Sequence, residues 1–159
     1  MILALRSDQP TTEIYLLDNS GQVVRHEKWN AERELARDLL AEIEKLVDGD
    51  FTKIDKIIVY QGPGSFTGLR IGISVANTLS YAFHAPIIGT TGERWLADGV
   101  TKLRDNLAMN QNEILPKNEK TTSENGVTFA TKAELERSLK LAIVTPNYGA
   151  AAHITKPKK

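Results

Sequence analysis

The chain has 159 residues, of which 41% are hydrophobic and 25% charged, and its 20 basic and 20 acidic side chains leave no net charge. This composition is typical of a globular domain, and the zero net charge argues against electrostatic attachment of the whole chain to nucleic acid. The absence of cysteine excludes disulfides and cysteine-based sites, and no apolar run approaches the roughly 18 residues of a membrane helix. We expect a cytoplasmic protein with no membrane partner.

Three short strands are expected near the N-terminus, over residues 2–5, 13–17 and 22–29. The last two are separated by an Asp-Asn-Ser-Gly sequence at 18–21, which strongly favours a turn. Strands joined by such short connections predict an antiparallel meander.

The hydrophobic pattern then changes to a helical period. Apolar residues spaced three and four apart predict a helix over residues 35–47, and a β-branched run predicts a buried strand at 54–60. A second helix is expected at 66–84, a fifth strand at 86–89 and a third helix at 91–103.

This order of elements predicts an α/β domain over residues 1–104, with a mixed five-stranded sheet and helices on its faces. The following residues, 105–128, are polar and are expected to form a loop or a partly disordered insert. The remainder, 129–159, is interpreted as a remnant with a helix at 131–139, a strand at 141–144 and a basic tail.

The most informative segment reads G-P-G-S-F-T-G-L-R-I-G and covers residues 62–72. A glycine-rich turn between a strand and a helix can offer backbone N–H groups and a helix dipole to an anion. The segment lacks the Lys-Ser/Thr pair of a Walker loop and the spacing of a dinucleotide-binding loop. The alternative interpretation is a tight turn with Ser65 or Thr67 as the helix N-cap.

Small residues recur at every fourth position of the second helix, at Gly68, Gly72, Ala76 and Ser80. Such a stripe allows another helix to approach closely. It fits either the domain's own core or a partner interface, and we favour the interface. We assign the following residues to it: Leu39, Ile43, Leu69, Gly72, Ile73, Ala76, Ser80 and Phe83. A leucine at Gly72 is then expected to block the partner and leave the monomer folded.

No catalytic arrangement is recognisable in the sequence. There are no paired carboxylates and no Ser-His-Asp pattern, and His26, His84 and His153 are too scattered for a metal site. His84 is expected to have a structural role at a helix end, and Trp29 and Trp95 are expected to pack. We assign no catalytic, cofactor-binding or metal-binding residue.

The glycine-rich segment resembles the motif of the TsaB (YeaZ) family, which assists bacterial synthesis of threonylcarbamoyladenosine at position 37 of tRNAs. The resemblance covers roughly residues 1–100 and is weaker at 144–148. The residues that carry the motif are Gly62, Pro63, Gly64, Ser65, Phe66, Thr67, Gly68, Leu69, Arg70 and Gly72.

This resemblance implies an actin/Hsp70-like ATPase (ribonuclease H-like) half-domain and a non-catalytic accessory or dimerisation subunit. Such a subunit pairs with the catalytic homologue TsaD, is joined by the ATPase TsaE, and contacts tRNA indirectly. The helices at 33–47 and 66–84 would form a bundle with the equivalent pair of TsaD or of a second copy. No cofactor is expected in the isolated chain, and ATP or ADP only at an interface of the complex.

The sequence departs from the family in three places. Leu5-Arg6-Ser7 stands where the family has Ile-Asp-Thr, so a phosphate-binding aspartate is replaced, and Leu35-Ala36 stands where it has His-Ser. The family's second domain is largely missing, which indicates a shortened form. The alternatives are a small nucleotide-binding ATPase or kinase of the same fold and a purely structural homodimer.

Overall fold

The computed structural model describes residues 1–31, 33–113 and 142–149. In this part of the chain, five strands form one sheet, accompanied by three α-helices and one short 3-10 helix. The elements are β1 (Ile2–Arg6), β2 (Thr11–Leu17), β3 (Val23–Asn30), α1 (Leu35–Leu46), η1 (Phe51–Lys53), β4 (Lys56–Tyr60), α2 (Phe66–Phe83), β5 (Ile87–Thr90) and α3 (Trp95–Glu113).

The strand order is β3-β2-β1-β4-β5. The first three strands pair antiparallel as a meander, with one irregularity between Leu16 and Leu17, whereas β4 and β5 run parallel to β1. Each parallel strand is reached through a helix, as a parallel crossover requires. The predicted α/β class with a mixed five-stranded sheet is therefore confirmed.

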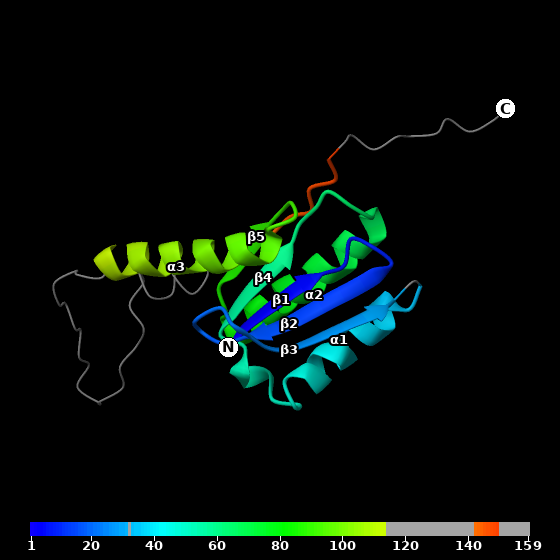
Figure 1. The fold of residues 1–159 in the computed structure, drawn as a ribbon, viewed down its shortest axis with the longest axis horizontal. Coiled ribbons are helices and arrows are strands. Elements are labelled where there is room, and N and C mark those ends of the chain that lie inside the picture. Colours follow the sequence, from blue (N-terminus) through cyan, green and yellow to red (C-terminus); the bar gives the residue numbers. More distant parts are fainter. Residues whose placement is uncertain (32, 114–141, 150–159) are drawn as a thin grey trace, which may run out of the picture.

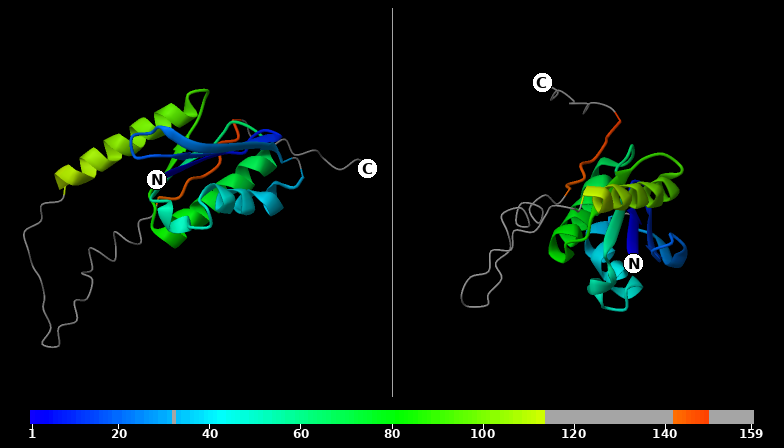
Figure 2. Two further views of the ribbon diagram at one scale, coloured as in Figure 1. Left: turned by 60° about the horizontal axis from the view of Figure 1, so that its bottom comes forward. Right: turned by 90° about the vertical axis from the view of Figure 1, so that its left-hand side faces the viewer.

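Two layers of helix enclose the sheet (Figures 1 and 2). α1 and α2 lie on one face and together touch all five strands, whereas α3 lies on the other face and packs mainly on β4 and β5. The central strands β1 and β4 are buried on both faces, so their sequences are almost continuously apolar. The buried side chains of β1 and β4 therefore fix the position of the two strand ends that lie next to the start of α2.

The third helix differs from the expected one at both ends. It begins at Trp95 rather than at 91, and it continues to Glu113 rather than ending near 103. Residues 105–113 of the expected polar loop are therefore helical, although most of them are polar. The rest of that loop and the predicted helix at 131–139 lie outside the described residues.

The predicted strand at 141–144 is wrong for the residues that the structure describes. Ala142 to Val144 join no sheet. Instead, the side chain of Asn77 on α2 donates to the Val144 carbonyl over 2.9 Å and accepts from its N–H over 3.1 Å. A side-chain amide thus satisfies the backbone groups that a neighbouring strand would otherwise pair. Within the described residues, no helix has the length and apolarity needed to cross a bilayer.

Candidate functional site: the motif loop and the strand ends

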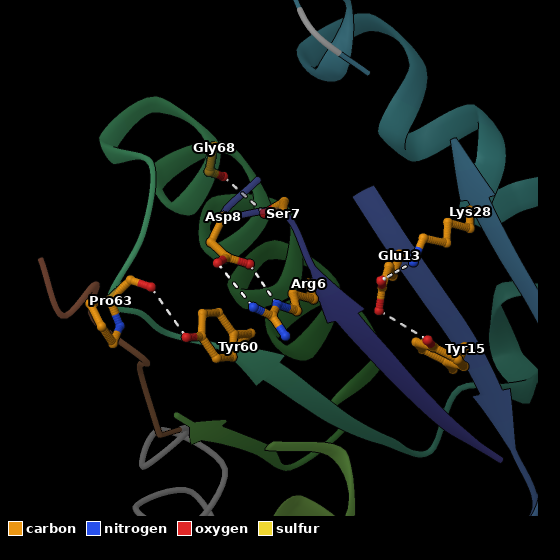
Figure 3. Close-up of polar contacts among 9 residues, drawn as sticks. All are labelled: Arg6, Ser7, Asp8, Glu13, Tyr15, Lys28, Tyr60, Pro63 and Gly68. Carbon is orange, nitrogen blue, oxygen red and sulfur yellow. Dashed lines mark hydrogen bonds and ion pairs between the residues drawn. The ribbon is translucent and has the colours of Figure 1, made fainter. Parts of the chain in front are cut away.

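The glycine-rich motif forms the connection from β4 to α2 and lies beside the end of β1 (Figure 3). Ser65 is the N-cap of α2, and its hydroxyl accepts the N–H of Gly68 at 3.4 Å, as one of the two sequence interpretations predicted. The carboxyl ends of parallel strands are where α/β folds place ligands. We call the place where the motif loop meets the end of β1 the corner. The side chains that lie there determine what the motif can bind.

An ion pair occupies the corner. Arg6, the last residue of β1, donates from Nε to Asp8 Oδ1 over 2.7 Å and from Nη2 to Oδ2 over 3.3 Å. Its guanidinium also lies over the Tyr60 ring, 4.4 Å from the centroid, and the Tyr60 hydroxyl donates to the Pro63 carbonyl over 3.2 Å. The hydrogen bond to Asp8 raises the pKa of Arg6. The cation is neutralised within the chain (Figure 3).

The Asp8 carboxylate also fills the place where the sequence allowed an anion. Its side chain is only 4% exposed, and a Cβ at Gly64 would overlap it. The Asp8 carbonyl accepts the Ser65 N–H over 2.8 Å. The glycines therefore serve close packing between the β1–β2 turn and the loop. The geometry supports the tight-turn interpretation of the motif.

The small-residue stripe of α2 faces the sheet. The hydroxyl of Ser7 donates to the Gly68 carbonyl over 2.9 Å, and a Cβ at Gly72 would overlap that same hydroxyl. Ala76 and Ser80 are also buried, and the Ser80 hydroxyl donates to the Ala85 carbonyl. The stripe allows α2 to lie directly against β1.

The predicted partner interface is therefore not a free surface. Phe83 is partly buried and stacks on Phe51 at 5.9 Å, and the other predicted members lie inside the chain's own core. These buried members are Leu39, Ile43, Leu69, Gly72, Ile73, Ala76 and Ser80. The close contact at Gly72 argues against the expectation that a leucine at this position would leave the monomer folded, because the neighbour that Gly72 approaches is Ser7 of the same chain.

A second polar group lies farther along the face that carries α3. Lys28 donates to Glu13 over 2.7 Å, and the Tyr15 hydroxyl donates to the same carboxylate over 3.0 Å. Burial opposes ionisation of Glu13, but the hydrogen bonds from Lys28 and Tyr15 outweigh it and lower its pKa. Burial and the bond to Glu13 raise the pKa of Tyr15. The group is balanced in charge and stabilises the β2–β3 pair.

The remaining candidates have structural positions. His84 is the C-cap of α2 in a left-handed conformation with φ of 52°, and Trp95 is buried between Tyr15 and Tyr60, so both expectations are confirmed. His26 stacks on Tyr15. His153 lies outside the described residues, among which no group of three His, Cys, Asp or Glu could hold a metal ion.

Three contacts of this region escaped the sequence reasoning. Asp8 forms an ion pair with Arg6, the Arg6 guanidinium lies over the Tyr60 ring, and the Asn77 side chain donates to the Val144 carbonyl. Asn77, the one side-chain amide on α2, was the available signal for a side-chain-to-backbone contact. The other two required knowledge of which strand ends are neighbours.

The comparison with protein families decides the relationship. The family model described as TsaD, tRNA N6-adenosine threonylcarbamoyltransferase, matches residues 23–109, more than half of the chain. The chain belongs to this family. The resemblance to TsaB/YeaZ and the actin-like fold that it implied are thereby confirmed.

Individual relatives agree with this assignment. The chain is 33% identical over 98 residues to the tRNA threonylcarbamoyladenosine biosynthesis protein TsaB of Bacillus subtilis, covering 60% of this chain and 43% of the relative. It is 55% identical over 40 residues to the tRNA N6-adenosine threonylcarbamoyltransferase of Dictyoglomus turgidum, covering 25% of this chain and 12% of the relative. The chain thus spans less than half the length of these relatives.

Solved structures give the same result. YeaZ from Pseudomonas aeruginosa superposes with a TM-score of 0.52 at 29% identity, over 57% of this chain and 43% of that one. A second match of the same similarity is titled as an uncharacterised protein with similarity to the peptidase YeaZ. The relatives whose names state a role in threonylcarbamoyladenosine biosynthesis are therefore matched over less than half of their own length.

Proposed function

We propose that this chain is a non-catalytic subunit that binds and stabilises a TsaD-like catalytic subunit in the modification of adenosine 37 of tRNA. The observation that carries the proposal is the 33% identity to TsaB over 98 residues, together with the structural similarity to YeaZ. The threonylcarbamoyl transfer to N6 of the adenosine belongs to the partner.

The corner at the end of β1 supports a role without chemistry of its own. In an ATPase of this fold an acidic residue at this place would hold the metal ion that accompanies the nucleotide, whereas this chain has Arg6, which pairs with Asp8 at 2.7 Å. The buried carboxylate would repel a phosphate, and the loop glycines are in contact with protein atoms. ATP or ADP would therefore bind only at an interface of the assembled complex, where a TsaE-like ATPase would also join, and tRNA would be contacted indirectly.

Pairing through the α1–α2 layer is supported by homology between the partners. The chain is similar both to TsaB and, over a shorter stretch, to the catalytic transferase. Two homologous chains can pair through equivalent surfaces about an approximate two-fold axis, as identical subunits do. Because the inner stripe is buried, the contact would use the outward side of these helices, where Leu40 and Tyr81 are exposed.

Size-exclusion chromatography with light scattering tests the proposal, using the full chain alone and mixed with a TsaD-type protein from the same source. A one-to-one complex is expected to replace the free species. If the chain stays separate from the TsaD-type protein at micromolar concentration, the proposal is overturned. A homodimer that the TsaD-type protein leaves intact would favour a purely structural role.

Thermal unfolding with ATP and Mg²⁺ tests the remaining alternative, a small ATPase or kinase. A ligand that binds only the native state must raise the unfolding temperature. The proposed function predicts no shift for the isolated chain, and a shift of several degrees would favour the nucleotide-binding alternative.

A further inference from the structure

Residues 142–149 form a strap that lies beside α2, on the sheet face that α1 and α2 cover (Figure 2). The Asn77 side chain forms hydrogen bonds with both the carbonyl and the N–H of Val144. Farther along, the N–H of Asn147 donates to the Gln61 carbonyl over 2.6 Å. The Val144 side chain is buried and lies close to Gly89 on β5. The strap is thus the third member of this layer, after α1 and α2.

The strap is also joined to the motif itself. The ring of Tyr148 stacks on Phe66, the first residue of α2, with centroids 4.6 Å apart, and the guanidinium of Arg70 lies 4.9 Å from the Phe66 ring centroid. An arginine, a phenylalanine and a tyrosine therefore form one stack across two segments distant in sequence. Stacking of this kind orders side chains that nevertheless remain open to solvent.

Several large apolar side chains of α2 and of the strap are exposed. Among the described residues, seven such side chains are exposed, and four of them lie on α2 or on the strap. These two segments therefore offer the largest share of exposed apolar side chains. The four are Phe66, Tyr81, Ile143 and Tyr148. Ile143 is 77% exposed although the next residue, Val144, is held in place from both sides. Exposed aromatic and aliphatic side chains on neighbouring segments are typical of interaction sites.

We infer that the strap and the outward side of α2 form one composite surface for the catalytic partner, and that Asn77 is the positioning residue that holds the strap in it. The inference rests on the proposed function and extends it to a segment that lies beyond the 23–109 family match. Arg70 is the single charged side chain of α2. The complementary partner surface is therefore an apolar helix face that carries a carboxylate for Arg70.

A titration of the full chain with the TsaD-type protein, followed by calorimetry, tests the inference. Ile143→Ser is the main variant, because this side chain is largely exposed and its loss leaves the fold intact. We expect roughly a five- to tenfold weaker complex, as for truncation of a central apolar contact. Val24→Ser is the matched control, because Val24 is 51% exposed but lies on β3, the edge strand opposite β5. The affinity of this variant for the TsaD-type protein is expected to stay unchanged.

A second variant tests the positioning role. Asn77→Ala removes both bonds to Val144 and is expected to weaken binding by a similar factor while Arg70 and the helix remain. Added free peptide of residues 142–149 should not restore the affinity, because the segment is then untethered.

The outcomes separate the inference from the proposed function. If the unaltered chain does not bind the TsaD-type protein, the proposed function itself fails. If it binds and Ile143→Ser binds equally well, or Val24→Ser weakens binding as much, the composite surface is overturned. If Ile143→Ser instead dissociates a homodimer and leaves the TsaD-type complex unchanged, the occupant is a second copy and the inference is also overturned.

Discussion

The two faces of the sheet are built by opposite means. On the α1–α2 face, α2 lies so close to β1 that Gly72 has no room for a Cβ beside Ser7, and the contact is dry. On the other face, α3 packs mainly on β4 and β5, and the strands β1 to β3 carry ion pairs between Arg6 and Asp8 and between Lys28 and Glu13.

This difference shows where each face can tolerate change. A dry contact between backbones has no spare volume, so any added atom must displace the helix. An exposed side chain such as Lys28 can exchange its partner for water, so the loss of its charge costs less. The stripe that was interpreted as a partner interface is therefore expected to tolerate larger side chains poorly.

The largest effect is expected from breaking the dry face. Gly72→Leu places a branched side chain against Ser7 and β1, and we expect a loss of about 3 kcal/mol or more in unfolding free energy, or no folded protein. Ser74→Leu is the matched control on the exposed side of the same helix and should change stability by less than about 0.5 kcal/mol. Urea unfolding followed by circular dichroism measures both. Equal stability of the two variants would contradict the packing described.

Substitutions in the Arg6–Asp8 ion pair should lower the stability less than Gly72→Leu does, and the two partners should differ in their effect. Arg6→Ala leaves the Asp8 carboxylate buried without its cation and is expected to cost about 2–4 kcal/mol. Asp8→Ala leaves Arg6, whose side chain is 22% exposed and can turn to water, so about 1–2 kcal/mol is expected. The comparison by urea unfolding at pH 7 fails if Asp8→Ala is the more damaging substitution.

A smaller and local effect is expected where the strap meets α2. Asn77→Ala removes the two bonds to Val144, so amide protection at 143–148 should fall while global stability changes by about 1 kcal/mol or less. Hydrogen exchange by mass spectrometry measures this. Thr78→Ala is the control, because that hydroxyl bonds only within its own helix, to the Ser74 carbonyl. Unchanged exchange in Asn77→Ala would mean that the bonds from Asn77 do not hold the strap.

The smallest effect concerns pH and the Glu13 group. Because Lys28 and Tyr15 lower the pKa of Glu13 in the fold, its contribution is present above the unfolded value near 4.3 and disappears as the pH falls through the folded value. Glu13→Gln should therefore be less stable than the unaltered chain by about 0.5–1 kcal/mol at pH 7, and the gap should narrow towards pH 3. A gap that widens on acidification would reverse the assigned sign.

Much of the sheet could be predicted from the sequence, because alternation, β-branched runs and turn residues are local signals. The strand and helix boundaries of β1 to β5 and of α1 and α2 differ from expectation by about two residues or fewer at each end. α3 was predicted too short because its last turns are polar, and polar helical residues resemble a loop when only apolar periodicity is considered.

The candidate site was less predictable because its contacts join residues far apart in sequence. The spacing of Gly68, Gly72, Ala76 and Ser80 correctly predicted a close approach, but spacing alone does not say whether the neighbour is β1 of the same chain or a helix of another. The direction of Asp8 likewise depends on the turn after β1, which brings its carboxylate back to Arg6.

The sequence by itself determined the fold class and the relationship to the threonylcarbamoyladenosine family, because each depends on local pattern or on a contiguous motif, whereas the structure decided that Ser65 rather than Thr67 caps α2. Only the tertiary structure decided which side of α2 is buried, how Arg6 is neutralised and where residues 142–149 lie. These outcomes follow from contacts between segments tens of residues apart, whose free energies depend on geometry that no local signal contains.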